Sequence, residues 1–510
     1  MERSTIGDVI RRGAQLFGGR TALVSDGRRH SYAELDETST RLADALLTAG
    51  AAPGDRVATL LFNDAAHVVV FLAAAKAGLV IVPVNRRLTA PEVASVLASA
   101  RPAVLIHDAA LESLARAGTA DSTARLVRVG GDPAEECSFE ALVGKGATTP
   151  PSVPVSGADT QAIYYTSGTT GTPKGVVRSH QSNVYMAWGY LAMMPVRPDD
   201  SVFYAFPLTS AAFYGLTVPA WMQGAKVVMH REFDAARLIH DLRAERVTHT
   251  ALAPTMWEML MAEPAHRDHP PTSLRYALWG GSPIRAGTLA RLAEWLPVPA
   301  GGVYGLTEAT CVTACVGEDL VAAPSSCGRP TAGSMVRVVG SGRRPVPAGE
   351  LGEVEICSLV CADGYYGNPD LTAEVFVDGW FRTGDVGCLD ADGRLFIVDR
   401  VKDLIISGGE NIYPGEIENA VTGLPGVQEV CALGVPDEKW GETVCVFIAP
   451  RPGAEVTVDA VLDACRERLA GYKRPRYVEF LPTLPKNSMG KFVKASLLDE
   501  WRSRLRGAAR

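Results

Sequence analysis

The chain has 510 residues, of which 47% are hydrophobic and 21% charged, and its formal net charge is -7. Single cores stop growing at roughly 250 to 300 residues, so a chain of this length is expected to form at least two domains. The composition excludes disordered, collagen-like and disulfide-dense proteins, and the acidic balance gives no electrostatic reason to expect nucleic acid or an anionic membrane as a partner.

Two features of the sequence bear on its location. The N-terminal residues lack the basic and then apolar order of a signal peptide. The strongest candidate for a membrane span, residues 65–84, is interrupted by His67 and Lys76 and falls short of about 20 clean apolar residues. We therefore predict a cytoplasmic protein with no membrane span.

The ten cysteines are scattered along the chain and are expected to be reduced thiols. Two pairs, Cys311 with Cys315 and Cys357 with Cys361, share a C-x3-C spacing that a four-thiolate zinc site could use. No histidine lies near them in sequence, and small buried apolar residues are the commoner role of cysteine. We therefore favour reduced, buried thiols over zinc.

The N-terminal region alternates between helical and strand patterns. Residues 31–34 match a capping box, and leucines at roughly helical spacing follow as far as Gly50, which predicts an amphipathic helix. Residues 57–61, 67–77 and 80–84 then indicate the strand, helix and strand of a βαβ unit. The predicted fold class is α/β with mostly parallel sheets.

Changes in composition predict the domain boundaries. Residues 144–158 are rich in Gly, Pro, Ser and Thr, which is typical of a connecting segment. Short β runs between residues 328 and 398 indicate a small, more antiparallel subdomain. We predict an N-terminal region over residues 1–399, with subdomains at about 1–157, 158–327 and 328–399.

The last block of the chain returns to helix and strand alternation. Residues 414–424 and 458–469 are predicted to be helices, and residues 427–433 and 443–449 are predicted to be strands. We therefore expect a separate α+β C-terminal domain over residues 400–510.

The strongest motif is a hydroxyl-rich and glycine-rich loop directly after an apolar strand, in residues 164–176. Backbone N–H groups and hydroxyls of such a loop can surround phosphate oxygens, and its lysine adds a cation. The spacing differs from the G-x4-G-K-[ST] loop of mononucleotide kinases. The candidate phosphate-binding residues are Thr166, Ser167, Gly168, Thr169, Thr170, Gly171 and Lys174.

With this loop and the motifs that follow it in order as far as Lys491, the chain resembles the AMP-forming acyl-CoA synthetases and their relatives, the peptide-synthetase adenylation domains and beetle luciferases. The resemblance covers nearly the whole chain. It implies an enzyme that uses ATP to activate a carboxylic acid as acyl-AMP and transfers the acyl group to coenzyme A. Two alternatives stay open: a stand-alone adenylation enzyme that loads a separate carrier protein, and a catalytically silent ATP-binding protein.

The resemblance also implies nucleotide contacts in the middle of the chain. Residues 304–308, Tyr-Gly-Leu-Thr-Glu, resemble the segment in which the aromatic ring stacks on adenine and the threonine meets the α-phosphate. Glu308 would help to hold Mg²⁺, an ion that prefers oxygen ligands. The candidates in this segment and in the adenine-side loop before it are Gly281, Ser282, Pro283, Tyr304, Gly305, Thr307 and Glu308.

Five further candidates lie between residues 385 and 409, at the end of the β-rich segment and just after it. Asp385 matches the family carboxylate that binds the ribose hydroxyls, and a carboxylate can accept two hydroxyl bonds at once. Arg400 matches a second ribose or phosphate contact. Lys402 aligns with the hinge about which the C-terminal domain turns. Gly408 and Gly409 resemble the loop that faces the pantetheine channel, where glycine permits close approach.

The C-terminal end of the resemblance supplies the catalytic candidate. Lys491 is the last residue of the segment 484–491, which resembles the family's catalytic-lysine segment. It matches the family lysine that stabilises negative charge on the phosphates during acyl-AMP formation. Lys486 and Lys494 are nearby rivals. Lys473 and Arg474 belong to a basic cluster that could neutralise the phosphates of coenzyme A.

The acyl side departs from the family pattern. Many relatives have Pro-Leu-Phe-His where this chain has Pro-Leu-Thr-Ser, so Ser210 replaces the histidine. The segment lacks the Asp that pairs with an amino-acid substrate and the Asn of dihydroxybenzoate activators. An apolar fatty or aromatic acid is therefore the predicted substrate. The candidate pocket walls are Phe213, Tyr214, Trp279, Gly280 and Val303.

Overall fold

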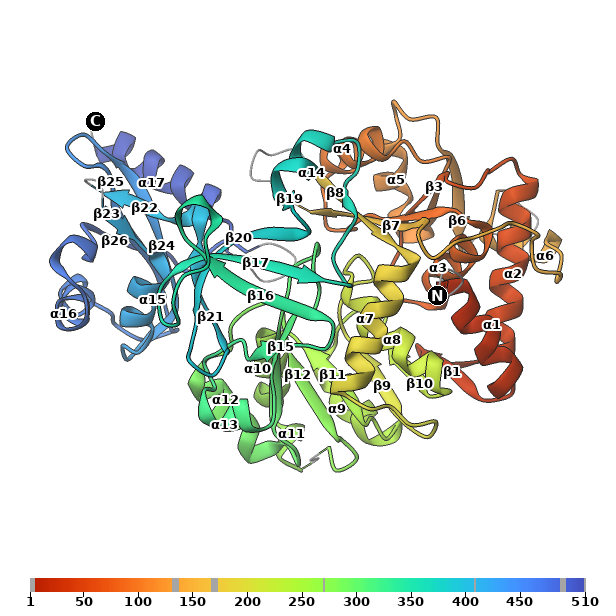
Figure 1. Cartoon of the computed structure of the whole chain (residues 1–510), viewed down its shortest axis with the longest axis horizontal. Coiled ribbons are helices and arrows are strands. Elements are labelled where there is room, and N and C mark those ends of the chain that lie inside the picture. Colours follow the sequence, from red (N-terminus) through yellow and green to blue (C-terminus); the bar gives the residue numbers. More distant parts are fainter. Residues whose placement is uncertain are drawn as a thin grey trace. The chain divides into compact units, whose positions relative to one another are not determined.

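The structure is a computed structural model, which describes residues 5–130, 137–166, 173–268, 271–407, 410–486 and 492–508 (Figure 1). The chain divides into two compact units. Unit 1 comprises Met1–Val336 and Ile356–Phe381, and unit 2 comprises Arg337–Glu355 and Arg382–Arg510.

A seven-stranded sheet in unit 1 has the order β18-β8-β7-β4-β3-β5-β6. Its strands are β3 (Arg56–Leu60), β4 (Val80–Pro83), β5 (Val104–Asp108), β6 (Arg125–Val129), β7 (Thr160–Thr166), β8 (Lys174–Ser179) and β18 (Gly364–Tyr365). The strands from β7 to β6 run parallel, whereas β8 pairs with β7 and β18 in antiparallel fashion. The predicted phosphate loop therefore connects two neighbouring, hydrogen-bonded strands.

A nine-stranded sheet in unit 1 has the order β15-β14-β13-β12-β11-β9-β10-β1-β2. Its strands are β1 (Thr21–Ser25), β2 (Arg28–Ser31), β9 (Ser201–Tyr204), β10 (Lys226–Met229), β11 (His249–Leu252), β12 (Tyr276–Trp279), β13 (Ala300–Tyr304), β14 (Thr313–Cys315) and β15 (Arg329–Pro330). The strands from β1 to β13 in this order run parallel. Because β1 joins this sheet and β7 joins the other, the predicted subdomain boundary near residue 157 does not coincide with a boundary between sheets.

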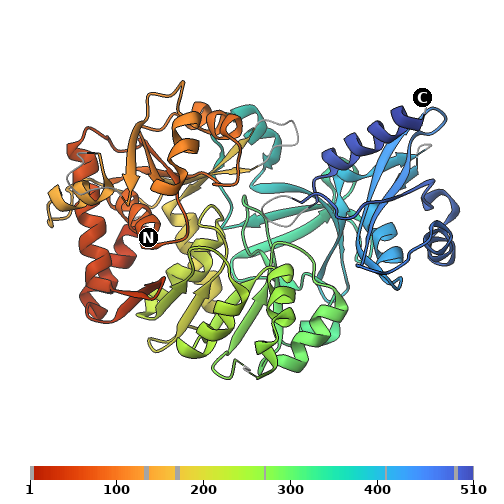
Figure 2. The ribbon, with the colours of Figure 1, turned by 180° about the vertical axis from the view of Figure 1, so that it is seen from behind.

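Helices cover both faces of the nine-stranded sheet. The helices of unit 1 as a whole, which cover its two sheets, are α1 (Ile6–Phe17), α2 (Tyr32–Thr48), α3 (Ala65–Ala77), α4 (Ala90–Ala100), α5 (Glu112–Gly118), α6 (Phe139–Lys145), α7 (His180–Met193), α8 (Ala212–Gln223), α9 (Ala235–Ala244), α10 (Pro254–Ala262), α11 (Ala265–Asp268), α12 (Ala286–Trp295), α13 (Glu318–Ala322) and α14 (Pro369–Val375), together with a 3-10 turn, η1 (Ala109–Leu111). Phe203 packs with α9, α10 and α12, and its neighbour Tyr204 packs with α8 on the other face. This alternation is the strand period of two, and Figure 2 shows the green helices of residues 235–295 over one face.

The predictions for the N-terminal region are confirmed at the level of elements. The Ser31 side chain accepts the N–H of Glu34, whose carboxylate accepts the N–H of Ser31, so α2 begins with the predicted capping box. The predicted βαβ unit is formed by β3, α3 and β4, and its two strands are parallel neighbours. The α/β fold class is confirmed.

A five-stranded sheet follows in the chain, with the order β16-β17-β20-β19 and with β21 beside β20. Its strands are β16 (Ser334–Val339), β17 (Gly352–Ser358), β19 (Phe376–Val377), β20 (Trp380–Leu389) and β21 (Leu395–Arg400), and it includes a 3-10 turn, η2 (Ser341–Arg343). The pairs β19–β20 and β20–β21 are antiparallel. The predicted β-rich character of residues 328–398 is confirmed.

The C-terminal part of unit 2 is an α+β arrangement around a second five-stranded sheet, with the order β23-β22-β25-β24 and with β26 beside β25. Its elements are η3 (Val401–Asp403), β22 (Ile405–Ser407), β23 (Glu410–Ile412), α15 (Pro414–Thr422), β24 (Val427–Asp437), β25 (Gly441–Pro450), α16 (Val458–Arg468), η4 (Gly471–Lys473), β26 (Tyr477–Phe480) and α17 (Lys494–Ala508). The helices and strands predicted here are confirmed. Ile417 of α15 packs on one face of the sheet, and Trp501 of α17 packs on the other.

Within the described ranges, no helix is both long and apolar enough to cross a membrane. All ten cysteines belong to these ranges and are free thiols. Four of them, Cys315, Cys431, Cys445 and Cys465, are buried.

Candidate active site

The base of the predicted phosphate loop is a β-hairpin. Thr166, the last residue of β7, pairs in register with Lys174, the first residue of β8. A Cβ added at Gly175 would lie 2.7 Å from Cγ2 of Ile163, so the strand needs glycine beside the loop. The predicted residues Ser167, Gly168, Thr169, Thr170 and Gly171 lie outside the described residues.

The Thr307–Glu308 segment forms a tight turn after β13. The N–H groups of Leu306 and Ala309 each donate to the carbonyl of the other, at 3.0 and 3.2 Å. A Cβ at Gly305 would lie 2.4 Å from the main-chain nitrogen of Cys311, so only glycine fits there. The N–H of Ala362 also donates to the Glu308 carbonyl at 2.7 Å. The backbone that carries both predicted phosphate-side residues is therefore held in one conformation.

Tyr365 connects the two motifs. Its hydroxyl donates to Oε1 of Glu308 at 2.8 Å, and the Nζ of Lys174 lies 5.9 Å from the centre of its ring. Tyr365 reaches this place because β18 pairs with β8, which sets Tyr365 opposite Val176. Our sequence reasoning missed this residue. The available signal was a pair of tyrosines between two turn-forming glycines, Gly364 and Gly367, which is too common a pattern to mark a site.

The adenine-side candidates lie together at one edge of the nine-stranded sheet. Trp279 ends β12 and Tyr304 ends β13, and these strands are parallel neighbours, so their carboxyl ends meet. A Cβ at Gly280 would lie 3.0 Å from Cγ2 of Val303. Ligands of open α/β sheets bind at this edge. The exposed residues Gly281, Ser282 and Pro283 continue from it, with Gly281 at a φ of 86°.

The acyl-side candidates on α8 are core residues. Phe213 and Tyr214 are fully buried, and the ring centre of Phe213 lies 4.8 Å from that of Phe71. The Tyr214 hydroxyl donates to Oε1 of Gln161. Ser210, which replaces the family histidine, is half-buried, and its Oγ accepts the N–H of Ala212 at 3.3 Å. The role of Phe213 and Tyr214 as pocket walls stays a prediction.

Unit 2 brings the two ribose-side candidates together. Asp385 of β20 and Arg400 of β21 are register partners, and Nε of Arg400 lies 2.8 Å from Oδ1 of Asp385. The Asp385 side chain is buried, and its N–H donates to Oγ1 of Thr383 at 2.9 Å. The pair can orient one carboxylate toward a diol because the guanidinium fixes the opposite oxygen.

The remaining C-terminal candidates differ in what the structure describes. Lys473 forms an ion pair with Glu416 at 2.7 Å, which raises the pKa of the lysine. Nε of Arg474 donates to the Leu469 carbonyl at 3.2 Å. Lys402 lies in η3, but the structure does not describe its side chain. Gly408, Gly409 and Lys491 lie outside the described residues.

The two rivals of Lys491 have partners within unit 2. Lys486 forms an ion pair with Glu429, and Lys494 forms one with Asp403 at 3.2 Å. Each of the two lysines therefore has a carboxylate partner.

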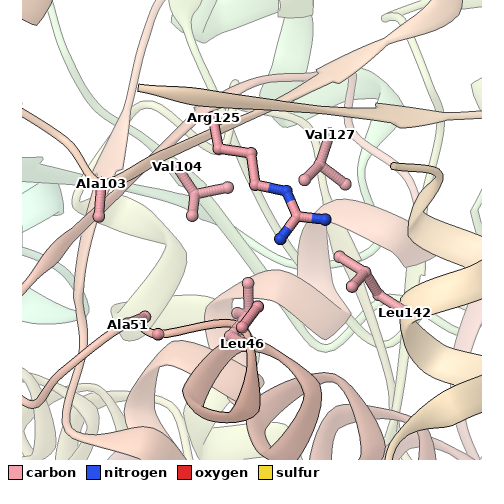
Figure 3. A pocket seen from close by; sticks show the side chains of 9 residues that line it. Leu46, Ala51, Ala103, Val104, Arg125, Val127 and Leu142 are labelled. Carbon is pink, nitrogen blue, oxygen red and sulfur yellow. The ribbon is translucent and has the colours of Figure 1, made fainter. Parts of the chain in front are cut away.

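A cavity of about 170 Å³ lies elsewhere in unit 1, between α2, α6 and the strands β5 and β6 (Figure 3). Its walls include Leu46, Val104, Val127 and Leu142, and the Arg125 side chain extends across it. None of the predicted site residues that the structure describes lines this cavity.

The donor set at the turn is compatible with magnesium. Mg²⁺ is usually held by one or two carboxylates together with substrate phosphates. Glu308 is half-buried, and one of its carboxylate oxygens accepts the Tyr365 hydroxyl. Among the residues that the structure describes, there is no group of three or more His, Cys, Asp or Glu that could hold a metal without substrate.

Parallel sheets that carry a hydroxyl-rich loop after β7 and a Thr-Glu turn after β13 define an adenylate-forming α/β enzyme. The model of the AMP-binding enzyme family matches residues 10–366, and that of the AMP-binding enzyme C-terminal domain matches residues 416–491. The chain therefore belongs to the AMP-binding enzyme family, as the motifs predicted.

Individual relatives agree with this assignment. A feruloyl-CoA synthase from Amycolatopsis sp is 38% identical over 500 residues, covering 98% of this chain and 99% of that protein. ScoC from Streptomyces coeruleorubidus, a fatty acid–[acyl-carrier-protein] ligase, is 35% identical, covering 94% of this chain and 93% of its own. The crystal structure of ATP-bound MatB from Rhodopseudomonas palustris matches with a TM-score of 0.89 and 28% identity over 98% of this chain and 99% of that one. The chain is an AMP-forming acid–thiol ligase.

Proposed function

We propose that the enzyme is a carboxylic acid–CoA ligase that works in two half-reactions. The acid attacks the α-phosphorus of ATP to give acyl-AMP and pyrophosphate, and the thiol of coenzyme A then displaces AMP. The observation that supports the proposal is Tyr365, which bonds Glu308 and whose ring centre lies 5.9 Å from Nζ of Lys174, so that one residue of the phosphate-loop motif and one of the Thr307–Glu308 turn share a neighbour.

In the first half-reaction, the residues of unit 1 hold the phosphates. The loop hydroxyls and N–H groups and Lys174 would surround the phosphate oxygens, and Thr307 would meet the α-phosphate. Glu308 would hold Mg²⁺, which supplies positive charge to the phosphates. Lys491 would stabilise the charge that grows on the phosphate oxygens in the transition state, an effect often of about 10² to 10³ in rate for one donor.

In unit 2, Asp385 and Arg400 would bind the ribose, since the guanidinium already orients the buried carboxylate. Residues 400–510 would turn about Lys402 between the half-reactions. The first family match ends at residue 366 and the second begins at residue 416, so the predicted hinge lies between the two matches. Closure of this kind keeps water from a reactive mixed anhydride.

Coenzyme A is the proposed acyl acceptor because a relative with 38% identity is named a feruloyl-CoA synthase. Gly408, Gly409, Lys473 and Arg474 would contribute to its binding. A carrier protein is the second candidate, and the similarity to ScoC is the specific observation that favours it. Either acceptor presents a thiol to the same acyl-AMP.

The substrate is proposed to be an apolar fatty or aromatic acid. The segment of residues 207–215 holds no charged residue, and the apolar residues Trp279 and Val303 lie near the carboxyl ends of the neighbouring strands β12 and β13. The names of the relatives include both an aromatic and a fatty acid. We propose that the reaction takes place in the cytoplasm.

The proposal is tested by incubating the protein with MgATP, coenzyme A and a panel of short and long aliphatic, aryl and amino acids. Pyrophosphate release and thioester mass are measured in parallel. Pyrophosphate together with a thioester from an apolar acid supports the CoA ligase. Pyrophosphate without thioester, followed by acyl transfer to a purified carrier protein, supports the second candidate. The Glu308→Gln variant, purified in the same way, controls for contaminating ligases. Its pyrophosphate release must fall if the activity belongs to this protein.

A further inference from the structure

A buried chain of hydrogen bonds connects α8 to the Thr307–Glu308 turn. Arg178 of β8 donates from Nη1 to the Thr307 carbonyl at 3.2 Å and from Nε to Oδ1 of Asn183 at 2.7 Å. Nδ2 of Asn183 donates to Oε1 of Gln161 at 2.9 Å, and the Tyr214 hydroxyl donates to the same oxygen. All four side chains are fully buried in unit 1.

The guanidinium at the end of this chain has an unusual environment. No carboxylate of the described residues lies within ion-pair distance of Arg178; Asp363 attracts it only from farther away. Burial lowers the pKa of Arg178, and its Nη2 has no hydrogen-bond partner among these residues. A buried charge without a close partner is costly, and an apolar side chain of similar size is often at least as stable in such a place. Stability alone therefore does not account for arginine here.

The Arg178 guanidinium contacts the Thr307–Glu308 turn through the Thr307 carbonyl. Two consecutive carbonyls of the turn each accept one fixed donor: Thr307 accepts from Arg178, and Glu308 accepts from the N–H of Ala362. The Arg178 bond is 3.2 Å long and the Ala362 bond 2.7 Å long, and the charge of the guanidinium strengthens the longer of the two. Together they set the planes of the peptides on both sides of Glu308, and with them the directions of the Thr307 and Glu308 side chains.

We propose that Arg178 is a positioning residue of the adenylation step. Its hydrogen bond to the Thr307 carbonyl orients the Thr307–Glu308 peptide. Asn183 holds the Arg178 guanidinium, and Gln161 holds the Asn183 amide. The inference rests on the proposed function, because it assigns the turn to the phosphates of ATP. A displacement of about 1 Å at such a site costs on the order of 10²-fold in rate, so the loss of this donor is expected to slow acyl-AMP formation.

The test compares Arg178→Met, Arg178→Lys and Asn183→Leu with the wild-type enzyme. Pyrophosphate release gives kcat and the KM for ATP, and thioester formation from supplied acyl-AMP reports the second half-reaction. Arg178→Met is expected to lower kcat for pyrophosphate release about 10- to 100-fold while thioester formation changes less than about 3-fold. Arg178→Lys is expected to restore part of the rate, because a cation remains near the carbonyl. Asn183→Leu, which leaves the Thr307 bond in place, is expected to have a smaller effect.

The matched control is Lys76→Met. Lys76 is another fully buried cation of unit 1, but it bonds Asp36 on α2. If Arg178→Met and Lys76→Met lower the melting temperature and both half-reactions in the same proportion, Arg178 is only structural and the proposal is wrong. If the wild-type enzyme releases pyrophosphate and the Arg178 and Asn183 variants release it at the same rate, this inference is wrong but the proposed function stands. Failure of the wild-type enzyme to release pyrophosphate with any acid overturns the proposed function and this inference with it.

Discussion

The hydroxyl of Tyr365 donates a hydrogen bond to the carboxylate of Glu308 at 2.8 Å, although the two residues are 57 positions apart in the chain. A hydrogen bond to a charged group contributes about 1.5 to 3 kcal/mol. We expect Tyr365→Phe to lower kcat/KM for pyrophosphate release about 10- to 100-fold. Tyr366→Phe removes a hydroxyl from the adjacent position and should leave the rate unchanged. Equal losses in both variants would contradict a specific role of Tyr365.

Glu308→Gln tests the charge rather than the shape of this contact. The amide oxygen can still accept the Tyr365 hydroxyl, but the negative charge that would hold Mg²⁺ is lost. Pyrophosphate release is expected to fall about 10²- to 10³-fold, and the Mg²⁺ concentration for half-maximal rate is expected to rise. If the Mg²⁺ concentration for half-maximal rate is unchanged in Glu308→Gln, Glu308 does not bind the metal.

Asp385→Asn tests the predicted ribose contact. If the carboxylate accepts the ribose hydroxyls, its loss should raise the KM for ATP about 10-fold or more and weaken the preference for ATP over 2′-deoxy-ATP and 3′-deoxy-ATP. Asp390→Asn is the matched control, because Asp390 pairs with Arg394 at 3.1 Å in the same hairpin. Unaltered discrimination between ATP and both deoxy analogues in Asp385→Asn would show that the carboxylate does not read the ribose.

Lys491→Ala is expected to slow adenylation about 10²- to 10³-fold, while thioester formation from supplied acyl-AMP stays within about 3-fold of the wild-type rate. The physical reason is that phosphate charge grows only in the first half-reaction. Lys486→Ala serves as the control, since Lys486 is paired with Glu429. Equal loss of both half-reactions in Lys491→Ala would make the assignment wrong.

His180 predicts a pH dependence of stability. It begins α7, its Nδ1 accepts the N–H of Ile6 at 3.2 Å, and burial lowers its pKa to about 4. The unfolded chain therefore binds this proton near pH 6.5, whereas the folded chain excludes it until about pH 4. The stability contributed by the neutral ring is complete above pH 6.5 and is lost as the pH falls toward 4.

One pKa unit corresponds to about 1.4 kcal/mol, so this group alone should lower the free energy of unfolding by about 3 kcal/mol across that window. Urea unfolding at several pH values measures the slope. His180→Asn should flatten it, and the exposed His240→Asn should not. An unchanged slope in His180→Asn would contradict a proton-excluding role.

Much of the fold was predictable because its signals are local. The capping box at Ser31, the β-branched strands β3 and β4, and the C-terminal helices α15 and α16 all depend on residues within one or two turns of each other. The order of strands in the sheets was not predictable in this way. That β1 joins β10, about 200 residues later, depends on which edges remain free after the rest of the chain has packed.

The site divides in the same manner. The order and spacing of the motifs from Thr166 to Lys491 determined the family and the chemistry, because phosphate, ribose and metal ligands must be particular residue types at particular places in each motif. Only the tertiary structure decided that Tyr365 meets Glu308 and that Arg178 meets the Thr307 carbonyl, across 57 and 129 positions. The first contact depends on the pairing of β18 with β8, and the second depends on the burial of Arg178 in β8. Neither leaves a periodic pattern in the chain.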